Sequence, residues 1–461
     1  MRIAMIGGGY VGLVSAACFA EFGVEVAVVE TDPGRLDKLR QGQIPIYEPG
    51  LDKLVADNIA AGRLSFGNDI KQAVTGVEAI FIAVGTPPRN GDGHADLTYV
   101  FAAAEQVAHA MSDYAVIVTK STVPVGTSRR IGEIISLTRP ELQFDVASNP
   151  EFLREGSAIN DFMRPDRVVI GTDVNKADGG ERAQEVMSRL YRPLYLIEAP
   201  ILFTSLESSE LIKYAANSFL AMKISFINEM ADLCERVGGD VHDVARGIGL
   251  DGRIGRKFLH AGAGYGGSCF PKDTLALMRI AQEAGASSRL VEATVQVNDA
   301  RKASMGARIM SACGGSVRGK TIAVLGLTFK PETDDMRDAP SIPIVHRLIE
   351  NGAHVRAYDP VGMETARAVM PQGPQAARIT YCIDALDAAR DADALILVTE
   401  WNEFRAIPAL RFRDLMKGRV IIDLRNVYDP AAMADADMDY SSIGRPRGRL
   451  LNVQARAASA G

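Results

Sequence analysis

The chain has 461 residues, too many for one hydrophobic core, so its length predicts two or three domains. Its net charge of −6 argues against nucleic acid or an anionic membrane as a main partner. Five scattered cysteines, without a CxxC pair or metal-ligand spacing, indicate a reducing, cytoplasmic compartment without disulfides or a metal site. The apolar start at Met1 has the pattern of a buried strand rather than a signal peptide, and no apolar run is long enough to span a bilayer.

The first residues have the pattern of a dinucleotide-binding turn. A strand over Arg2–Ile6 leads into Gly7, Gly9 and Gly12, which fit G-x-G-x-x-G at the start of a helix. The next strand ends at Glu30, roughly 20 residues past the glycines, where the acid that binds the ribose belongs. A carboxylate there repels a 2′-phosphate, so NAD is favoured over NADP. A glycine-rich turn in another α/β domain is the weaker alternative, because strand, helix, strand and acid all agree.

Further strands end in polar segments that a parallel sheet would direct toward the cofactor. The strands over 79–84 and 115–118 precede Gly85-Thr86-Pro87 and Lys120-Ser121-Thr122-Val123-Pro124, at the edge where such sheets bind ligands. Glu151 and Glu155 follow within the segment 148–156. These two carboxylates would share one face if the segment were helical, and an acidic surface turn is the alternative.

A long amphipathic helix is predicted from Ser205 to about Val237. Lys213 and Asn217 are four residues apart and rotated by roughly half a turn from the apolar stripe. We expect the stripe to pack inward and this pair to point into a cleft; a solvated lysine is the alternative. The helix could join two domains and form part of a dimer interface. The stripe recurs at spacings of three and four residues and comprises Leu211, Ala215, Phe219, Met222, Phe226, Met230 and Leu233.

The glycine-rich segment 262–273 is the best candidate for the chemistry. Four glycines in six positions precede Cys269, and Pro271 suits the first turn of a helix. A cysteine at a helix N-terminus has its thiolate stabilised, and Lys272 and Asp273 add charge nearby. A small buried cysteine after a flexible loop is an equally supported alternative from this segment alone.

The C-terminal third repeats the pattern of the N-terminal third. Strands over 320–326, 352–359, 392–398 and 420–423 echo the first four, without the glycine motif. Phe329, Lys330 and Arg425 are suited instead to a base and phosphates. The sequence therefore predicts an α/β fold of two doubly wound Rossmann-like domains joined by a long central helix. The expected parts are 1–204 for NAD, 205–300 central and helical, 301–443 for the nucleotide sugar, and a flexible tail over 444–461.

In these blocks together the chain resembles the UDP-glucose 6-dehydrogenases of the nucleotide-sugar dehydrogenase family, from residue 1 to roughly 440. The resemblance implies an NAD-dependent, four-electron oxidation of the C6 alcohol of UDP-glucose to a carboxylate. It makes Cys269 the nucleophile that forms a thiohemiacetal and then a thioester. Lys213 and Asn217 would stabilise the oxyanion. Asp273 and Thr122 would position water, with Glu155 as base and Glu151 in support.

The same resemblance assigns the binding residues, and Arg253 would reach the sugar of a neighbouring subunit in at least a homodimer. The NAD contacts it implies are Gly7, Gly9, Tyr10, Val11, Gly12, Glu30, Arg35, Thr86, Thr122, Glu155, Lys272 and Arg337. The nucleotide-sugar contacts it implies are Phe152, Leu153, Glu155, Lys213, Asn217, Arg253, Phe258, Gly266, Phe329, Lys330 and Arg425.

Three alternatives stay open beside UDP-glucose oxidation. The same chemistry could act on GDP-mannose or a UDP-N-acetylamino sugar. A 3-hydroxyacid dehydrogenase would share the first domain, the long helix and the Lys/Asn pair, but residues 320–440 and Cys269 argue against it. A silent protein that senses NAD and a nucleotide sugar would have no physical need for a thiolate.

Overall fold

A computed structural model describes residues 1–89 and 93–445, and its contacts divide the chain into two compact units. The first contains Met1–Ala216 and Leu275–Ala286, and the second contains Asn217–Thr274 and the chain from Ser287 onward. Both boundaries fall inside helices, namely α9 (Leu206–Val237) and α11 (Phe270–Glu283). Each unit is therefore described by itself.

The first unit is built on an eight-stranded sheet with the order β3-β2-β1-β4-β5-β6-β7-β8, parallel except where β7 runs antiparallel to β6. The central strands β1, β4 and β5 are rich in Ala, Val and Ile and buried on both faces, as a covered parallel sheet requires. The strands are β1 Arg2–Ile6, β2 Glu25–Val29, β3 Leu64–Gly67, β4 Ala79–Ile82, β5 Ala115–Thr119, β6 Phe144–Ser148, β7 Val168–Thr172 and β8 Ile201–Ser205.

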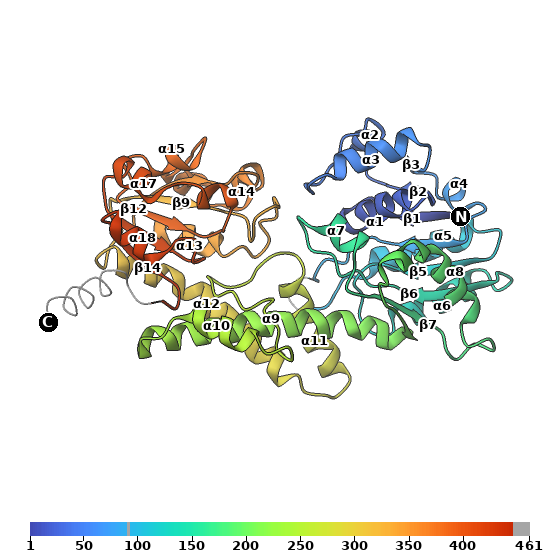
Figure 1. The fold of residues 1–461 in the computed structure, drawn as a ribbon. Helices are drawn as coiled ribbons and strands as arrows, with labels where there is room; N and C mark the ends of the chain where they lie inside the picture. Colours follow the sequence, from blue (N-terminus) through green and yellow to red (C-terminus); the bar gives the residue numbers. More distant parts are fainter. Residues whose placement is uncertain (90–92, 446–461) are drawn as a thin grey trace. The chain divides into compact units, whose positions relative to one another are not determined.

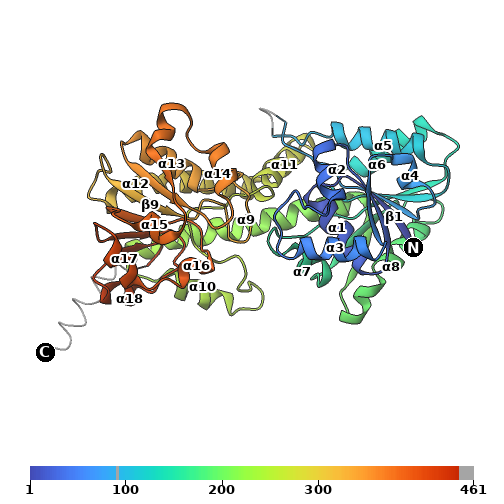
Figure 2. The ribbon, with the colours of Figure 1, turned by 90° about the horizontal axis from the view of Figure 1, so that it is seen from above.

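Helices cover both faces of this sheet. Figure 2 shows α4, α5 and α6 on one side of β1, and α1, α3 and α8 on the other, which matches two separate apolar clusters. The helices are α1 Tyr10–Glu21, α2 Pro33–Arg40, α3 Leu51–Ala60, α4 Ile70–Val74, α5 Thr98–Ala110, α6 Thr127–Thr138, α7 Ala158–Met163, α8 Glu181–Leu190 and the short 3₁₀ helix η1 Arg192–Ile197.

The second unit contains an all-parallel six-stranded sheet with the order β11-β10-β9-β12-β13-β14 (Figure 1). Numbered along its own chain, this is the order 3-2-1-4-5-6 that the first six strands of the other unit also adopt, so the predicted repeat is confirmed. The strands are β9 Thr321–Leu325, β10 His354–Tyr358, β11 Ile379–Tyr381, β12 Ala394–Leu397, β13 Val420–Asp423 and β14 Asp439–Ser442.

Helices α12 and α13 pack against one face of the second sheet, and α15, α17 and α18 against the other. Residues 446–461 of the expected tail lie outside the described residues, and Gly444 just before them donates its N–H to Glu235. The helices are α10 Val241–Gly249, α12 Arg289–Ala312, α13 Ser341–Glu350, α14 Met363–Val369, η2 Gly373–Arg378, α15 Ala385–Ala389, α16 Asn402–Arg405, α17 Ala409–Leu415 and α18 Pro430–Asp435.

The long helix α9 corrects one prediction. Most of its apolar stripe does not pack inward, because Leu211, Phe219, Phe226 and Leu233 are 43–58% exposed in the single chain. Met230 of the same stripe does pack against the core of the second unit. The buried face of the helix instead carries polar side chains, including Lys213 and Asn217. Periodicity identifies an apolar face but does not say which neighbour covers it. Within the described residues, no helix is long and apolar enough to cross a membrane.

Candidate active site

The turn between β1 and α1 has the geometry of a phosphate cradle. Gly7 has φ +111°, and a Cβ there would lie 2.7 Å from the carbonyl oxygen of Ala83. A Cβ on Gly12 would lie 2.0 Å from the oxygen of Gly7, so the helix packs too tightly on the turn for any side chain. A Cβ on Gly9 would meet open space at the N-terminus of α1. Its backbone is therefore accessible where a pyrophosphate is expected.

The predicted ribose-binding acid lies beside this turn. Glu30 follows β2 directly and is 7% exposed. Its Oε1 accepts a hydrogen bond from the N–H of Asp32 at 2.8 Å. A Cβ on Gly8 would come within 2.9 Å of the other carboxylate oxygen, so the acid and the glycines share one site. Arg35 lies on the exposed first turn of α2.

The segments that follow β4 and β5 are joined at the carboxyl edge of the sheet. The hydroxyl of Thr86 donates to the carbonyl of Thr122 at 3.0 Å, and Ser121 donates to the carbonyl of Val84 at 2.6 Å. Both segments therefore border the place where a Rossmann sheet binds its dinucleotide.

A buried carboxylate that the sequence analysis missed ties this turn to the segment after β6. Glu48 accepts hydrogen bonds from the N–H of Gly156 at 2.6 Å and the N–H of Ala158 at 2.7 Å. It also accepts one from the hydroxyl of Tyr10, whose pKa is raised by burial and by that contact. Since Tyr10 opens α1 and Gly156 follows Glu155, one side chain holds the cofactor turn and the acidic loop together. No local pattern marks Glu48, because its partners are distant in sequence.

Lys213 on α9 and Glu151 form a buried ion pair. Their Nζ and Oε1 atoms are 2.9 Å apart, and the side chains are only 3% and 6% exposed. The second oxygen of Glu151 accepts from the N–H of Leu153 at 2.6 Å, and Lys213 also lies over the ring of Phe152. The segment that carries Glu151 and Glu155 is a loop rather than a helix. A side chain that binds its own backbone two residues on competes with helix formation.

Cys269 lies directly before α11, as predicted, and it is half-buried. Its Sγ is 3.4 Å from the hydroxyl oxygen of Ser268. The other four cysteines are free thiols and buried. Burial raises the pKa of Cys18 to about 12 and that of Cys382 to about 11, so these two stay protonated at neutral pH.

Polar side chains from two helices hold the loop before Cys269. Asn228 of α9 accepts from the N–H of Gly262 at 2.8 Å, and Arg301 of α12 donates to the carbonyl of the same glycine at 2.9 Å. Asn298 of α12 bonds both the N–H and the carbonyl of Tyr265. These hydrogen bonds hold the loop through its backbone groups, so its position does not depend on the side chain of Cys269.

The same loop packs closely on the segment between β9 and α13. A Cβ on Gly267 would lie 2.6 Å from the ring of Phe329, and one on Gly266 would lie 2.4 Å from the carbonyl oxygen of Asp338. Phe258, with φ +65°, has its ring centroid 6.0 Å from that of Phe270. The structure therefore brings Cys269, Phe258 and Phe329 into one region of the second unit.

Asp273, on the first turn of α11, is 1% exposed and engages both oxygens. One accepts from the amide of Asn217 at 2.6 Å, and the other accepts from Lys272 at 2.7 Å. The Asn217 amide nitrogen is therefore aimed by a carboxylate, as the Lys213 ammonium is in the first unit.

Three of the four arginines assigned from sequence each lie on a carboxylate. Arg425 forms two hydrogen bonds with the carboxylate of Glu400. Burial alone would raise the pKa of Glu400, but the charge of the guanidinium outweighs this effect and the pKa is lowered. Arg337 binds Asp335 through two nitrogens. Arg253 binds Asp251, and its side chain is 90% exposed. Lys330 lies 5.3 Å from the ring of Phe329.

The second half cannot cradle a dinucleotide as the first does. Residues 326–340 separate β9 from α13, so no helix N-terminus follows the first strand directly. Asp359, after β10, is fully buried and accepts from the N–H groups of Leu327 and Gly362 and from the indole of Trp401. Its carboxylate is thus used to hold the loop and is not presented to a ribose.

The sheet order, the glycine turn and Glu30 define the first unit as the NAD-binding domain of a dehydrogenase. Three family models match the chain in sequence, all of the UDP-glucose/GDP-mannose dehydrogenase family: the NAD binding domain over residues 1–195, the central domain over 207–300 and the UDP binding domain over 323–430. The chain belongs to this family and is an NAD-dependent oxidoreductase.

Individual relatives agree with this assignment. A UDP-glucose 6-dehydrogenase of Rhizobium meliloti is 59% identical over 446 residues, covering 97% of this chain and all of that protein. One from Bacillus subtilis is 48% identical over 96% of this chain and 93% of its own length. The solved UDP-glucose dehydrogenase of Pyrobaculum islandicum matches with TM-score 0.86 at 38% identity, covering 96% of this chain and 98% of that one.

Proposed function

We propose that the protein oxidises the C6 alcohol of UDP-glucose to a carboxylate in two NAD-dependent steps, with Cys269 as covalent nucleophile. The observation that carries this proposal is the placement of Cys269, a half-buried thiol in a glycine loop directly before the N-terminus of α11. The partial positive charge of a helix N-terminus favours a thiolate. The names of the relatives support the choice of substrate.

NAD, when bound, supplies the hydride acceptor for both oxidations. After the first oxidation, the Cys269 thiolate forms a C–S bond with the aldehyde carbon, giving a thiohemiacetal. Its carbon is tetrahedral, so a second hydride can leave and produce a thioester. Water then forms a C–O bond as the C–S bond breaks, which restores the thiol. One UDP-glucose, two NAD⁺ and one water thus give one UDP-glucuronate, two NADH and three protons.

The remaining catalytic roles are assigned to polar side chains near the Cys269 loop and the loop that carries Glu151 and Glu155. Lys213 and Asn217 stabilise the oxyanion, and losing one such donor commonly costs about 10²- to 10³-fold in rate. Thr122 and Asp273 orient the hydrolytic water. Glu155 accepts its proton, a role usually worth about 10²- to 10⁴-fold, while Glu151 holds Lys213. The carboxylate contacts of Lys213 and Asn217 support this assignment because they fix both donors.

The NAD site rests on the fit between the turn and a dinucleotide. Gly9 leaves open space at the N-terminus of α1, and the Glu30 carboxylate lies beside the glycines for the ribose hydroxyls. The residues that would hold NAD are Gly7, Gly9, Tyr10, Val11, Gly12, Glu30, Arg35, Thr86, Thr122, Glu155, Lys272 and Arg337.

The nucleotide sugar is assigned to residues from several parts of the sequence. Phe329 and Lys330 would hold the nucleotide, and Arg425 would contact the substrate while paired with Glu400. The other residues proposed for the substrate are Phe152, Leu153, Glu155, Lys213, Asn217, Arg253, Phe258 and Gly266.

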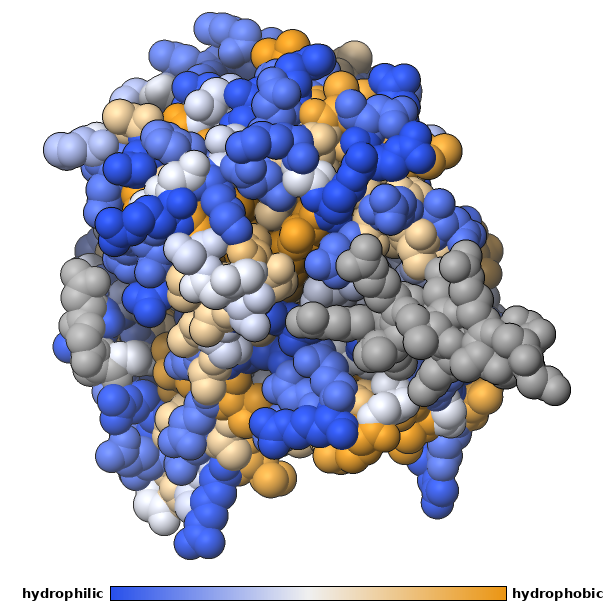
Figure 3. Space-filling model, turned by 90° about the vertical axis from the view of Figure 1, so that its left-hand side faces the viewer, coloured by the Kyte–Doolittle hydropathy of each residue, from blue (hydrophilic) through white to orange (hydrophobic). Residues whose placement is uncertain are grey.

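We further propose a homodimer built on the exposed stripe of α9. Phe219, Phe226 and Leu233 recur at seven-residue spacing and are 58%, 46% and 50% exposed. A row of large apolar side chains exposed to water is typical of a surface that another chain covers. Figure 3 also shows apolar surface low on its face. The exposed Arg253 supports its role toward a second subunit. The five free thiols support a reducing, cytoplasmic location.

A related nucleotide sugar is the second candidate. A solved UDP-D-ManNAc dehydrogenase of Pyrococcus horikoshii shares the fold with TM-score 0.81, over 96% of this chain and 99% of that one, but at 26% identity. The test is the amount of NADH formed per limiting sugar, measured in parallel with UDP-glucose, GDP-mannose and UDP-N-acetylmannosamine. About two NADH per UDP-glucose, with little from the others, supports the proposal. One NADH would mean that the reaction stops at the aldehyde.

A further inference from the structure

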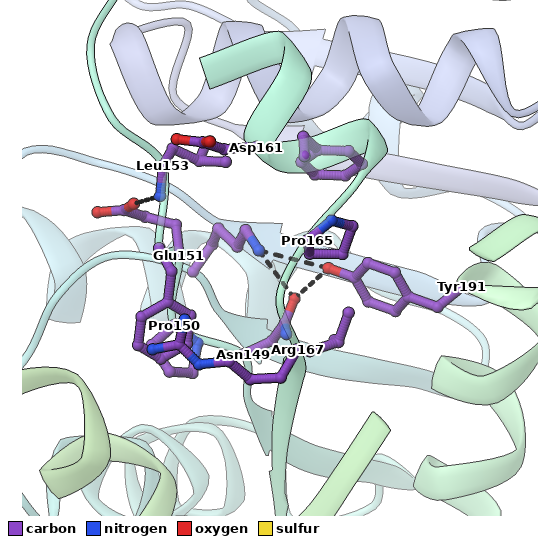
Figure 4. Close-up of a pocket in the computed structure, with 12 residues that line it drawn as sticks. Asn149, Pro150, Glu151, Leu153, Asp161, Pro165, Arg167 and Tyr191 are labelled. Carbon is purple, nitrogen blue, oxygen red and sulfur yellow. Dashed lines mark hydrogen bonds between the residues drawn. The ribbon is translucent and has the colours of Figure 1, made fainter. Parts of the chain in front are cut away.

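A cavity lies behind the acidic loop of the first unit. It has about 340 Å³ of empty space, part of it open to solvent (Figure 4). It is lined by the segment 149–153, by Lys120 just after β5, by Tyr191 just after α8, and by side chains of α7 and the start of β7. Among its walls are two cations, Lys120 and Arg167, and two carboxylates, Glu151 and Asp161. The cavity is therefore polar, and it lies directly behind the residue that holds Lys213.

Lys120 is the buried centre of this cavity wall. It follows β5 directly, is 3% exposed, and donates to the side-chain oxygen of Asn149 at 3.0 Å and to the hydroxyl of Tyr191 at 3.3 Å. Tyr191 in turn donates to the same Asn149 oxygen at 2.6 Å. Figure 4 shows the side chains of Asn149 and Tyr191 pointing toward each other, with the hydrogen bond between them drawn as a dashed line. Since Asn149 begins the loop that carries Glu151, Lys120 holds that loop at its root.

No carboxylate lies within ion-pair distance of Lys120 in the described part of the chain, which is costly for a buried amine. Burial lowers the pKa of Lys120 from 10.5 to about 8, with the charge of Glu151 opposing this shift and that of Lys213 adding to it. A polar but uncharged side chain could make both hydrogen bonds. Hydrogen bonding to Asn149 and Tyr191 therefore does not by itself explain why the side chain at this position carries an ionisable amine.

We propose that Lys120 is a positioning residue for the oxidation: it anchors Asn149 and places a second positive charge beside the Lys213–Glu151 pair. This rests on the proposed function, in which Lys213 stabilises an oxyanion. With Lys120 protonated, the three side chains carry a net charge of one positive unit; with Lys120 neutral, they carry none. The positive charge favours negative charge that develops near Lys213.

The other charges around Lys120 leave this effect in place. Asp161 is bound by Arg154 through two nitrogens, and Arg167 stacks on Phe152 with its guanidinium carbon 3.6 Å from the ring centroid. Cys18 also faces Lys120, and burial raises its pKa to about 12, so it is neutral near pH 8. The hydroxyl of Tyr191 is likewise neutral, because burial raises its pKa. Glu151 and Lys213 are thus the charges that couple to Lys120.

The test is the pH dependence of kcat for NADH formation in four variants and the wild type. The wild type should lose activity as pH rises through about 8, where Lys120 loses its proton. Lys120→Met should be about tenfold slower at pH 7 and should lack this fall. Lys120→Arg, whose charge persists and whose bulk the cavity can take, should recover most of the rate at pH 7 and hold it at pH 9.

Two controls separate charge from anchoring. Tyr191→Phe removes one acceptor but keeps the amine, so it should keep the fall near pH 8. Lys176→Met removes a lysine that is paired with Asp145 in the same unit, and it should leave the profile unchanged. A fall near pH 8 that persists in Lys120→Met, or an arginine variant no faster than the methionine variant, would overturn the proposal.

A second measurement does not depend on catalysis. Between about pH 8 and 10.5 the unfolded chain holds the Lys120 proton and the folded chain does not, so wild-type stability should rise with pH relative to Lys120→Arg. A constant difference between the two would contradict the charge change at Lys120. The NADH stoichiometry tests the proposed function separately. If the wild type made one NADH per sugar and still showed the stability trend, the two-step oxidation would be rejected, whereas the loss of the Lys120 proton would be supported.

Discussion

The ammonium of Lys213 and the carboxylate of Glu151 lie 2.9 Å apart, and both side chains are almost completely buried. Removing one partner of such a pair leaves an uncompensated charge, at a cost of about 3–5 kcal/mol. Lys213→Met should therefore lower the free energy of unfolding by about that amount, and Lys213→Met with Glu151→Gln should recover part of it. Urea unfolding measures both. A double variant no more stable than the single one would mean that the pair is not coupled.

Two glycines of the same turn should respond in opposite ways. Gly12→Ala puts a methyl group against the oxygen of Gly7, so it should destabilise the fold by about 1–3 kcal/mol or more. Gly9→Ala meets open space at φ −74°, which alanine adopts, so it should keep the melting temperature but weaken NAD binding about tenfold. Thermal unfolding and NAD titration separate the two effects. Unchanged NAD affinity in Gly9→Ala would count against the pyrophosphate site.

Glu48 should contribute to the stability of the fold. Glu48→Ala leaves the partly buried N–H of Gly156 and the buried N–H of Ala158 without an acceptor, at up to about 1–3 kcal/mol each. Tyr10→Phe removes the third contact and should cost less. Glu25→Gln, on an exposed side chain, is the matched control and should be neutral. If Glu48→Ala unfolds at the same urea concentration as the control, the carboxylate does not join these segments.

The exposed stripe of α9 should hold two subunits together. Phe226→Glu and Leu233→Glu put charges on the exposed face without touching the core of either unit, so they should produce monomers. Glu229→Gln, exposed on the same helix, should not. Sedimentation velocity distinguishes these outcomes, and a wild-type chain that sediments as a monomer would reject the homodimer directly.

Most of the fold was predictable because its signals are local. The first strand, the glycine turn and Glu30 are close in sequence. The repeated strand pattern in the last third of the chain predicted the second sheet. Cys269 and the start of α11 were predictable for the same reason, since Pro271 and the glycines flank them.

The parts that were missed depend on distant partners. Glu48 contacts Gly156, 108 residues away, and Lys120 meets Tyr191, 71 residues away, so neither carries a local pattern. The loop at Glu151 was open to a helical interpretation because spacing does not reveal that its carboxylate binds the N–H of Leu153. The direction of the α9 stripe was wrong because an apolar face can be covered by a second chain as well as by the first.

The most direct test of the covalent mechanism is the mass of the peptide that contains Cys269. Glu155→Gln should slow thioester hydrolysis, so incubation with UDP-glucose and excess NAD should yield about two NADH per site in a burst. The acid-quenched digest should contain a UDP-glucuronyl group on Cys269 that hydroxylamine releases. Two NADH per site with an unmodified Cys269 peptide, or with the adduct on another residue, would contradict it.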